Sequence, residues 1–214
     1  MATLGYHHRF EPPPAGTPVA PPLLLLHGAG GNENDLITLG RRISTGSALL
    51  SPRGDVSEHG ARRFFARLAE GVFDPAEVTR RTHALADFIV AATAHYGIDH
   101  TRLIAVGMSN GANIAATLLQ LRPNTLAGAI LLRPMLVLDQ AAPAGSLTGK
   151  RILIASGNAD PIVPQDHPSR LAALLQSGGA TVTIHTASAG HNLTADDLTA
   201  SQQFLNQMAN KQVH

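Results

Sequence analysis

Short apolar runs alternate with longer amphipathic patterns along the whole chain, and this alternation constrains the fold more than any other feature. The apolar runs have the length of strands, and the patterns between them have the length of helices. Strands that alternate with helices favour a parallel sheet with crossover helices. Runs that are apolar throughout fit strands whose two faces are both covered by helices. The sequence therefore predicts an α/β fold with a mostly parallel central sheet and helices on both of its faces.

The element boundaries can be placed from the same pattern. The expected strands cover Tyr6–Phe10, Leu23–Leu26, Ser47–Ser51, Leu103–Val106, Ala127–Leu132, Arg151–Ala155 and Thr181–His185. The expected helices cover Asn34–Arg42, Pro75–Tyr96, Ala112–Leu121, Gln165–Ser177 and Ala195–Ala209. Asn, Asp, Pro or Gly stands at the ends of these helices, as is typical of helix boundaries. No internal repeat interrupts the series, so we expect residues 1–214 to form one domain.

The composition excludes several classes of function. Lys and Arg total 16 against 15 Asp and Glu, so the chain lacks the basic excess that binds a phosphate backbone, and we expect no nucleic-acid partner. The absence of cysteine removes disulfides, thiolate metal sites and cysteine nucleophiles, and it fits a reducing compartment. No apolar run is long enough for a bilayer, and the first residues do not form a secretory signal. We therefore expect a cytoplasmic protein without a membrane span.

Two segments between expected strands are irregular. Six prolines lie in Pro12–Pro22. The spacing of Pro18 and Pro21 would suit a polyproline ligand, but a stiff surface connection is the favoured interpretation, since prolines are excluded from central strands. The second segment, Pro52–Asp74, carries three of the six phenylalanines. We expect this aromatic segment to flank a pocket.

The motif Gly107-Met108-Ser109-Asn110-Gly111 follows an expected strand and directly precedes an expected helix. In that context a Gly-x-Ser-x-Gly motif is typical of a nucleophile elbow, a sharp turn that lifts the serine hydroxyl above the sheet. The positions two before and two after the serine must lack side chains, because otherwise the helix would collide with the strand. Both positions are glycine. A purely structural turn is the alternative, and the serine of this motif is the candidate nucleophile.

A serine nucleophile needs a histidine base and a carboxylate that orients the base. Asp160 and His191 each follow an expected strand, so both are predicted at the carboxyl edge of the sheet, where ligand sites of such sheets lie. The chain order Ser, Asp, His is that of α/β-hydrolase triads. An Asp-Pro turn is the alternative interpretation of Asp160. Asp166 is the main rival for the acid, and Asp139 is a weaker one.

Acyl transfer also needs N–H donors that face the developing oxyanion. The glycine-rich segment His27–Asn32 follows an early expected strand, and its backbone can approach a ligand closely. We assign the two donors to the backbone N–H groups of Ala29 and of Asn110, the residue after the candidate nucleophile. A phosphate cradle is the rival interpretation, but the segment lacks both the GK[ST] ending and the G-x-G-x-x-G spacing.

Several segments together resemble the phospholipase/carboxylesterase family of α/β-hydrolases, which includes acyl-protein thioesterases. The segments are LLLLHGAGGNENDL, GMSNGANIA, GNADPIVP and AGHNL, and the resemblance runs nearly end to end. Two further segments, RRFFARLAEGVFD and LLRPM, look most like small bacterial hydrolases of the type induced by methylhydroquinone. The resemblance implies an α/β-hydrolase fold with little or no cap domain.

The resemblance also implies roles for individual residues. The implied nucleophile, acid, base and oxyanion-hole donors are Ser109, Asp160, His191 and the backbone of Ala29 and Asn110. Phe64, Phe65 and Met135 are implied to lie near the acyl or alcohol pocket, with a plain core role as the alternative for each. Relatives often carry histidines before the Pro-Met pair, where this sequence has Leu132-Arg133.

We therefore expect a serine carboxylesterase that hydrolyses small carboxylic esters, with short to medium acyl or aryl groups, without a cofactor or metal. Within enzymes the alternatives are a thioesterase acting on acylated proteins or small thioesters, and a peptidase. A hydrolase fold that serves as a non-catalytic ligand-binding module is the alternative outside enzymes. The sequence leaves the oligomeric state open, a homodimer included. It also leaves open the acyl-chain preference and any link to hydroquinone-like compounds.

Overall fold

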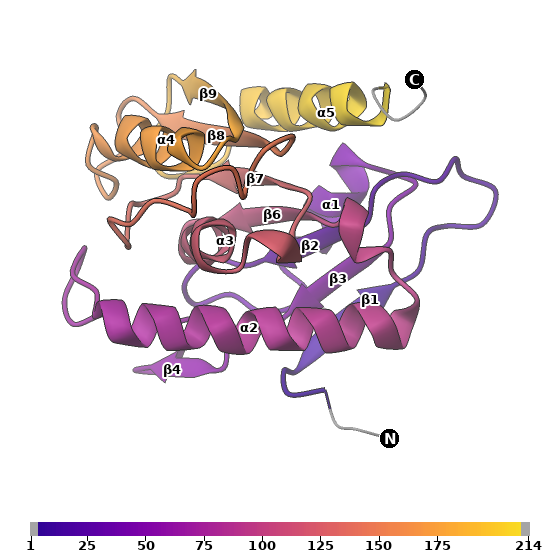
Figure 1. The fold of residues 1–214 in the computed structure, drawn as a ribbon, viewed down its shortest axis with the longest axis horizontal. Coiled ribbons are helices and arrows are strands. Elements are labelled where there is room, and N and C mark those ends of the chain that lie inside the picture. Colours follow the sequence, from indigo (N-terminus) through magenta and orange to yellow (C-terminus); the bar gives the residue numbers. More distant parts are fainter. Residues whose placement is uncertain (1–3, 211–214) are drawn as a thin grey trace.

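A seven-stranded mixed sheet forms the centre of the computed structural model, which describes residues 4–210 (Figure 1). The strands lie in the order β1-β3-β2-β6-β7-β8-β9. Their bounds are β1 (His8–Glu11), β2 (Leu23–Leu26), β3 (Leu49–Pro52), β6 (Ile104–Met108), β7 (Gly128–Leu132), β8 (Arg151–Gly157) and β9 (Thr181–Ala187). Only β1 runs antiparallel to its neighbour, while every other neighbouring pair in this sheet is parallel. The mostly parallel sheet is thus confirmed.

Helices cover both faces of this sheet, and a separate apolar core lies under each layer. The helices are α1 (Ile37–Ile43), α2 (Pro75–Tyr96), α3 (Asn110–Leu121), α4 (His167–Ser177) and α5 (Ala195–Asn210), with short 3-10 turns at His100–Arg102 and Pro123–Thr125. One core contains buried residues of α2, α3 and α4, and the other contains those of α1 and α5. Leu24 and Leu26 of β2 belong to the first core, while Leu23 and Leu25 belong to the second. A strand with alternate side chains in two cores must be apolar throughout, as β2 is.

The bounds of α2 agree with the expected Pro75–Tyr96 because local signals set both ends. The Asp74 side chain accepts a hydrogen bond from the Ala76 N–H at 2.9 Å, and Pro75 occupies the first helical position. Gly97 ends the helix with φ 66°. The strand β2 also has its expected bounds, Leu23–Leu26, and the other elements differ from the prediction by a few residues at one or both ends.

Part of the segment that the sequence predicted as irregular forms a hairpin. Within Pro52–Asp74, β4 (Val56–Glu58) pairs antiparallel with β5 (Ala61–Arg63). The two turn residues, His59 and Gly60, have φ values of 50° and 87°, which is typical of a tight hairpin turn. The strands are only three residues long, so they are too short to show an alternating pattern in the sequence. Among the described residues this hairpin is the one sheet outside the central sheet.

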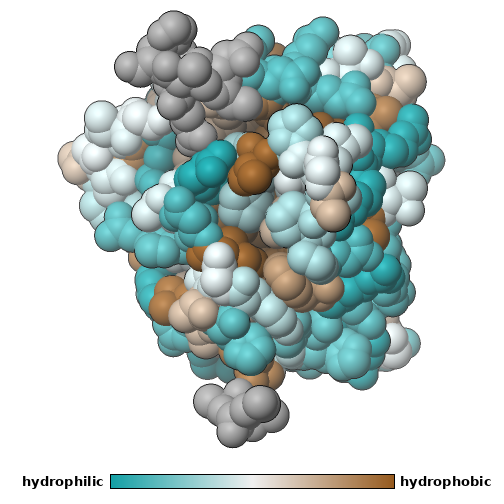
Figure 2. Space-filling model, turned by 90° about the vertical axis from the view of Figure 1, so that its right-hand side faces the viewer, coloured by the Kyte–Doolittle hydropathy of each residue, from teal (hydrophilic) through white to brown (hydrophobic). Residues whose placement is uncertain are grey.

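The segment Pro12–Pro22 connects β1 to β2 across the surface, as expected for a stiff connection, and it forms the long loop at the right of Figure 1. Figure 2 shows that side of the molecule, where hydrophilic residues predominate and apolar residues occur in small separate groups. Val19 in this loop is 76% exposed. No helix within residues 4–210 is both long enough and apolar enough to cross a membrane.

Candidate active site

Ser109 lies in a sharp turn between β6 and α3. Its backbone has φ 51° and ψ −115°, a conformation that residues with a Cβ rarely adopt. A side chain at Gly111 would overlap the carbonyl oxygen of Leu26 in β2, and one at Gly107 would overlap the first turn of α3. The two glycines therefore allow α3 to pack closely against β2 and β6, and this is why the motif requires glycine at both positions. The Ser109 N–H donates to the Leu132 carbonyl oxygen at 2.8 Å and so ties the turn to β7.

The structure brings the three candidate triad residues together. The Nε2 of His191 lies 2.9 Å from Oγ of Ser109, and its Nδ1 lies 2.8 Å from Oδ2 of Asp160. When Nδ1–H donates to the carboxylate, Nε2 is free to accept the serine proton. The Asp160 side chain is only 3% exposed, whereas that of His191 is 20% exposed. The hydroxyl, the imidazole and the carboxylate are thus within hydrogen-bonding reach in the order that serine nucleophiles require.

Hydrogen bonds within the turn after β8 orient the Asp160 carboxylate toward His191. Its Oδ1 accepts hydrogen bonds from the backbone N–H groups of Ile162 at 2.8 Å and Val163 at 3.2 Å, which leaves Oδ2 for His191. Burial by itself raises the pKa of Asp160, but the hydrogen bonds from these N–H groups and from His191 outweigh burial and lower the pKa below its usual value. The carboxyl group is therefore ionised at neutral pH.

The two rival acids lie on the surface. The side chain of Asp166 is 60% exposed and that of Asp139 is 68% exposed. Both pair with Arg170, at 3.2 Å and 2.9 Å respectively. Neither carboxylate contacts His191, so among the three candidate acids only Asp160 is in place to orient the imidazole.

The glycine-rich segment after β2 lies against the elbow. A Cβ on Gly28 would stand 3.8 Å from the Cβ of Ser109. The N–H groups of Ala29 and Asn110 donate to no acceptor among the described residues, and Asn110 is the first residue of α3, where helix N–H groups lack partners within the helix. The stabilisation of an oxyanion requires donors of this kind, with N–H groups that no protein acceptor occupies. Their assignment to an oxyanion hole stays a prediction.

His27 fixes the shape of this segment, a role that was not predicted from the sequence. Its side chain is buried, with Nε2 accepting from the Gly54 N–H at 2.9 Å and Nδ1 lying 2.7 Å from the Gly28 carbonyl oxygen. This pair of contacts requires the neutral imidazole with the proton on Nδ1. Burial lowers the pKa of His27 and so favours that neutral form. Its position directly before the glycines was the available sequence signal.

Two asparagines in the first turn of α3 hold the segments that carry the predicted pocket residues. Oδ1 of Asn110 accepts from the Phe64 N–H at 2.8 Å, and Oδ1 of Asn113 accepts from the Met135 N–H at 2.7 Å. Both asparagines are buried, so these bonds replace hydrogen bonds to water that the amides have lost. The helix that begins at the elbow thereby also positions the walls around it.

The predicted pocket residues are buried. Phe64 and Phe65 are fully inaccessible to solvent, and Met135 is 6% exposed. The Phe64 ring packs on His27 at a centroid distance of 4.8 Å, and the Phe65 ring packs edge-on against Phe73 at 5.5 Å. Both phenylalanines thus occupy the core, which is the alternative that the sequence left open. Contact between a substrate and Phe64, Phe65 or Met135 stays a prediction.

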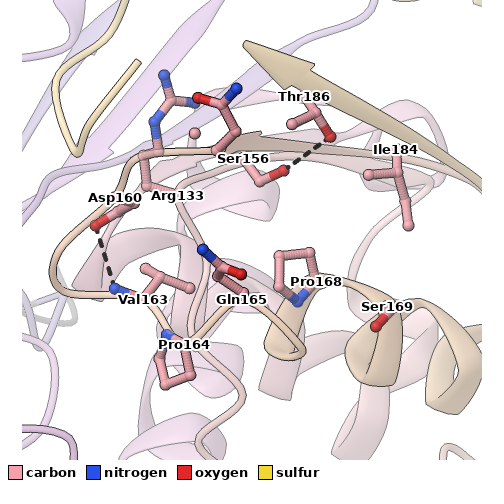
Figure 3. Close-up of a pocket in the computed structure, with 12 residues that line it drawn as sticks. Arg133, Ser156, Asp160, Val163, Pro164, Gln165, Pro168, Ser169, Ile184 and Thr186 are labelled. Atoms are coloured by element: carbon pink, nitrogen blue, oxygen red, sulfur yellow. Dashed lines mark hydrogen bonds between the residues drawn. The ribbon is translucent and has the colours of Figure 1, made fainter. Parts of the chain in front are cut away.

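A cavity of about 310 Å³ lies beside Asp160, between the ends of β8 and β9 and the segment that leads to α4 (Figure 3). Ser156 and Thr186 line it, with their hydroxyl oxygens 3.3 Å apart. Ser109 is not among its lining residues, so this cavity reaches the acid and not the candidate nucleophile. Within residues 4–210, no three His, Asp or Glu side chains gather closely enough to hold a metal ion.

Comparison with known proteins identifies similar chains. Residues 69–209 match the family model described as phospholipase/carboxylesterase. The protein named Putative hydrolase MhqD, from Bacillus subtilis, is 41% identical over 182 residues, which cover 85% of this chain and 90% of the relative.

Among solved structures, carboxylesterases are also similar to this chain. The carboxylesterase of Bacillus cereus superposes with a TM-score of 0.88 and 39% identity, covering 95% of this chain and 94% of the other. A carboxylesterase from Mesorhizobium loti superposes with a TM-score of 0.87 and 33% identity, covering 96% and 97% respectively. These similarities confirm the expected α/β-hydrolase fold.

Proposed function

Because the chain belongs to the phospholipase/carboxylesterase family, we propose that this carboxylic ester hydrolase is a serine esterase with Ser109 as nucleophile, His191 as base and Asp160 as acid. The observation that carries the proposal is the hydrogen-bonded series from Oγ of Ser109 through the imidazole to Oδ2 of Asp160, with distances of 2.9 Å and 2.8 Å. The elbow supports the same assignment, as do the N–H groups of Ala29 and Asn110, which find no acceptor among the described residues.

In the acylation step, Nε2 of His191 accepts the Ser109 proton while Oγ attacks the ester carbonyl carbon. The negative charge that develops on the carbonyl oxygen is stabilised by the N–H groups of Ala29 and Asn110, each worth on the order of 3 kcal/mol in comparable enzymes. When the tetrahedral intermediate collapses, the bond to the leaving oxygen breaks and His191 donates its proton to the departing alcohol. The acyl group remains on Ser109 as an ester.

In the deacylation step, His191 accepts a proton from a water molecule that attacks the acyl carbon. The carboxylic acid leaves, and the proton returns to Oγ of Ser109. Asp160 stays ionised throughout, because its lowered pKa disfavours protonation, and its hydrogen bond keeps the imidazole in the tautomer that presents Nε2 to the serine.

Small esters are the proposed substrates. Ser109 is partly exposed, and the one sheet that the described residues add to the central sheet is the short hairpin β4-β5, so we infer a site with little cover. An uncovered site encloses little of a long substrate and favours short to medium acyl or aryl groups.

The test is hydrolysis of p-nitrophenyl esters from acetate to decanoate by the wild type and by Ser109→Ala, with a fluorophosphonate label as a second readout. We expect turnover that is highest for the shorter chains and at least about 1000-fold lower in the variant, with the label on Ser109. Labelling without ester turnover would redirect the substrate search to thioesters. The absence of both labelling and turnover would contradict the proposed mechanism and would favour the binding-module alternative.

A matched pair of substitutions tests the acid. Asp160→Asn should lower kcat by up to about 10⁴-fold, because the amide favours the wrong imidazole tautomer. Asp166→Asn removes an exposed carboxylate of the same segment and should leave kcat within about 2-fold, as is usual for surface positions. The reverse ranking would move the acid to Asp166.

A further inference from the structure

Arg133 follows the last residue of β7, and no role for it was predicted from the sequence. Its side chain is fully buried, and its backbone has φ 54°, which is uncommon for a residue with a Cβ. A buried cation in a rarely adopted conformation persists only where the surrounding structure holds it. The contacts of its guanidinium show what this arrangement achieves.

The guanidinium of Arg133 donates to both sides of His191. Nε donates to the Gly190 carbonyl oxygen at 3.0 Å, and Nη2 donates to the Asn192 carbonyl oxygen at 3.0 Å. These two carbonyls belong to the residues immediately before and after the imidazole-bearing residue. Because the guanidinium is planar and rigid, the two carbonyl oxygens are held in a fixed relation to each other.

The remaining N–H groups anchor this clamp to the rest of the fold. Nη1 donates to the Ala155 carbonyl oxygen of β8 at 3.1 Å and to Oδ1 of Asp197 at 2.9 Å, and Nη2 also donates to Oδ2 of Asp197 at 2.7 Å. Asp197 is 2% exposed, lies in the first turn of α5, and accepts further hydrogen bonds from the Thr194 N–H and hydroxyl at 2.8 Å each. The clamp therefore joins β8, α5 and the His191 segment through one side chain.

We propose that Arg133 is a positioning residue for the base: through the carbonyls of Gly190 and Asn192 it holds the imidazole of His191 between Ser109 and Asp160. The proposal rests on the proposed function of His191. Hydrogen bonds of 2.8 and 2.9 Å on the two sides of the ring leave little room for displacement. A misplacement of about 1 Å from a change outside the reacting groups can lower a rate by about 100-fold.

The first test is Arg133→Lys, which keeps the charge but loses the planar fork. We expect kcat on p-nitrophenyl acetate to fall about 10- to 100-fold while KM changes less than about 3-fold, because the imidazole moves and the rest of the site does not. Arg41→Lys is the matched control. Arg41 also pairs with a carboxylate, that of Glu11, and donates to the carbonyl oxygens of Ser47 and Pro12, but it lies near β1, at the other edge of the sheet from β9. Its replacement should therefore lower stability without changing kcat.

A second variant separates positioning from stability. Arg133→Met combined with Asp197→Leu removes both buried charges, and such replacements of an ion pair are often neutral for stability. Positioning predicts a melting temperature near that of the wild type together with a kcat that stays reduced. Recovery of both properties would overturn the proposal and leave the pair a purely structural one. This double variant decides the question even where Arg133→Lys does not fold.

A readout that needs no ester distinguishes this proposal from the proposed function. The Nδ1 proton of His191, assigned by its loss in His191→Gln, should give a sharp downfield proton resonance in the wild type, and it should broaden or shift in both Arg133 variants. An unchanged resonance together with an unchanged kcat in a folded variant would overturn the positioning role. A wild type without esterase activity would instead count against the proposed function, while the resonance would still report on the clamp.

Discussion

Two neighbouring strands of the sheet, β6 and β7, end in the same way and continue differently. Ser109 follows β6 and Arg133 follows β7, with φ values of 51° and 54°. Each residue donates its backbone N–H to the last paired residue of the next strand, Ser109 to Leu132 at 2.8 Å and Arg133 to Ala155 at 2.7 Å. After the first turn the chain enters a helix at once, whereas after the second it forms no helix or strand until β8 begins at Arg151.

The difference explains why only one of the two turns needs glycines. Gly107 and Gly111 bracket Ser109 because α3 returns against β2 and β6, but Leu131 and Met135 occupy the corresponding positions around Arg133. The glycine bracket is therefore a requirement of the returning helix and not of the left-handed φ. One turn exposes a hydroxyl for chemistry, and the other buries a cation that supports the base.

The same substitution at both turns should separate these roles most clearly, beginning with Ser109→Gly. Catalysis should fall at least about 1000-fold, because the nucleophile is lost. Stability should rise by about 1 kcal/mol, since glycine adopts this backbone conformation without strain. Ester hydrolysis and thermal unfolding measure the two effects, and a rise in melting temperature of about 2–4 °C is expected. A lower melting temperature would show that the turn is not strained.

Arg133→Gly relieves the same φ and should nevertheless destabilise the protein by about 3 kcal/mol, because Asp197 is left as an unpaired buried charge. Chemical denaturation measures the free energy of unfolding. In an Asp197→Leu background, where that carboxylate is absent, Arg133→Gly should lower the free energy of unfolding by much less. An equal loss in both backgrounds would mean that the ion pair is not the source of the effect.

Gly111→Ala tests the steric half of the comparison. Its Cβ would overlap the carbonyl oxygen of Leu26, and a crowded core position of this kind costs about 1–3 kcal/mol. We also expect slower fluorophosphonate labelling, because the elbow must shift. Gly5→Ala is the matched control, since a Cβ there meets no atom within 4 Å. Equal stability of the two variants would remove the steric explanation of the glycine bracket.

The smallest expected effect is a dependence on pH that belongs to the Arg133 turn. Burial by itself raises the pKa of Asp197, but the hydrogen bonds from Arg133 and Thr194 outweigh burial, so the pKa lies below its usual value. A carboxyl group with a lowered folded-state pKa contributes stability above its unfolded pKa of about 3.9 and loses this contribution as the pH falls below that value.

The stability gap between the wild type and Asp197→Asn should therefore be widest near pH 7 and should narrow below about pH 4. Urea unfolding at several pH values measures it. A gap that stays constant from pH 7 to pH 3 would show that Asp197 is not stabilised in its charged form.

The parts of the fold that could be predicted are those whose bounds depend on residues close together in the sequence. The ends of α2 follow from Asp74, Pro75 and Gly97. The bounds of β2 were predicted correctly, since four consecutive leucines suit a short strand that is covered on both faces. The first strand was predicted at Tyr6–Phe10 but lies at His8–Glu11, because its ends are set by antiparallel pairing with β3. Pairing partners distant in the sequence leave no local mark.

The candidate site divides in the same way. The elbow could be recognised from its glycines, and Asp160 and His191 from their positions after successive strands. The burial of Phe64 and Phe65 could not be predicted, since it depends on how the segment after β5 folds against His27 and Phe73. The clamp was also beyond the sequence: Arg133 and Asp197 are 64 residues apart and meet only because β7 and α5 approach the same end of β8.

Because Arg133 contacts the main-chain oxygens of Gly190 and Asn192, these two contacts do not depend on the side chains at those positions. Asn192 is exposed, and a Cβ on Gly190 would meet its nearest neighbour at an ordinary 3.6 Å. Mutational drift at these two positions can therefore proceed while the imidazole stays in place. For directed evolution, we therefore expect Gly190 and Asn192 to be positions that accept new side chains without rebuilding the catalytic geometry.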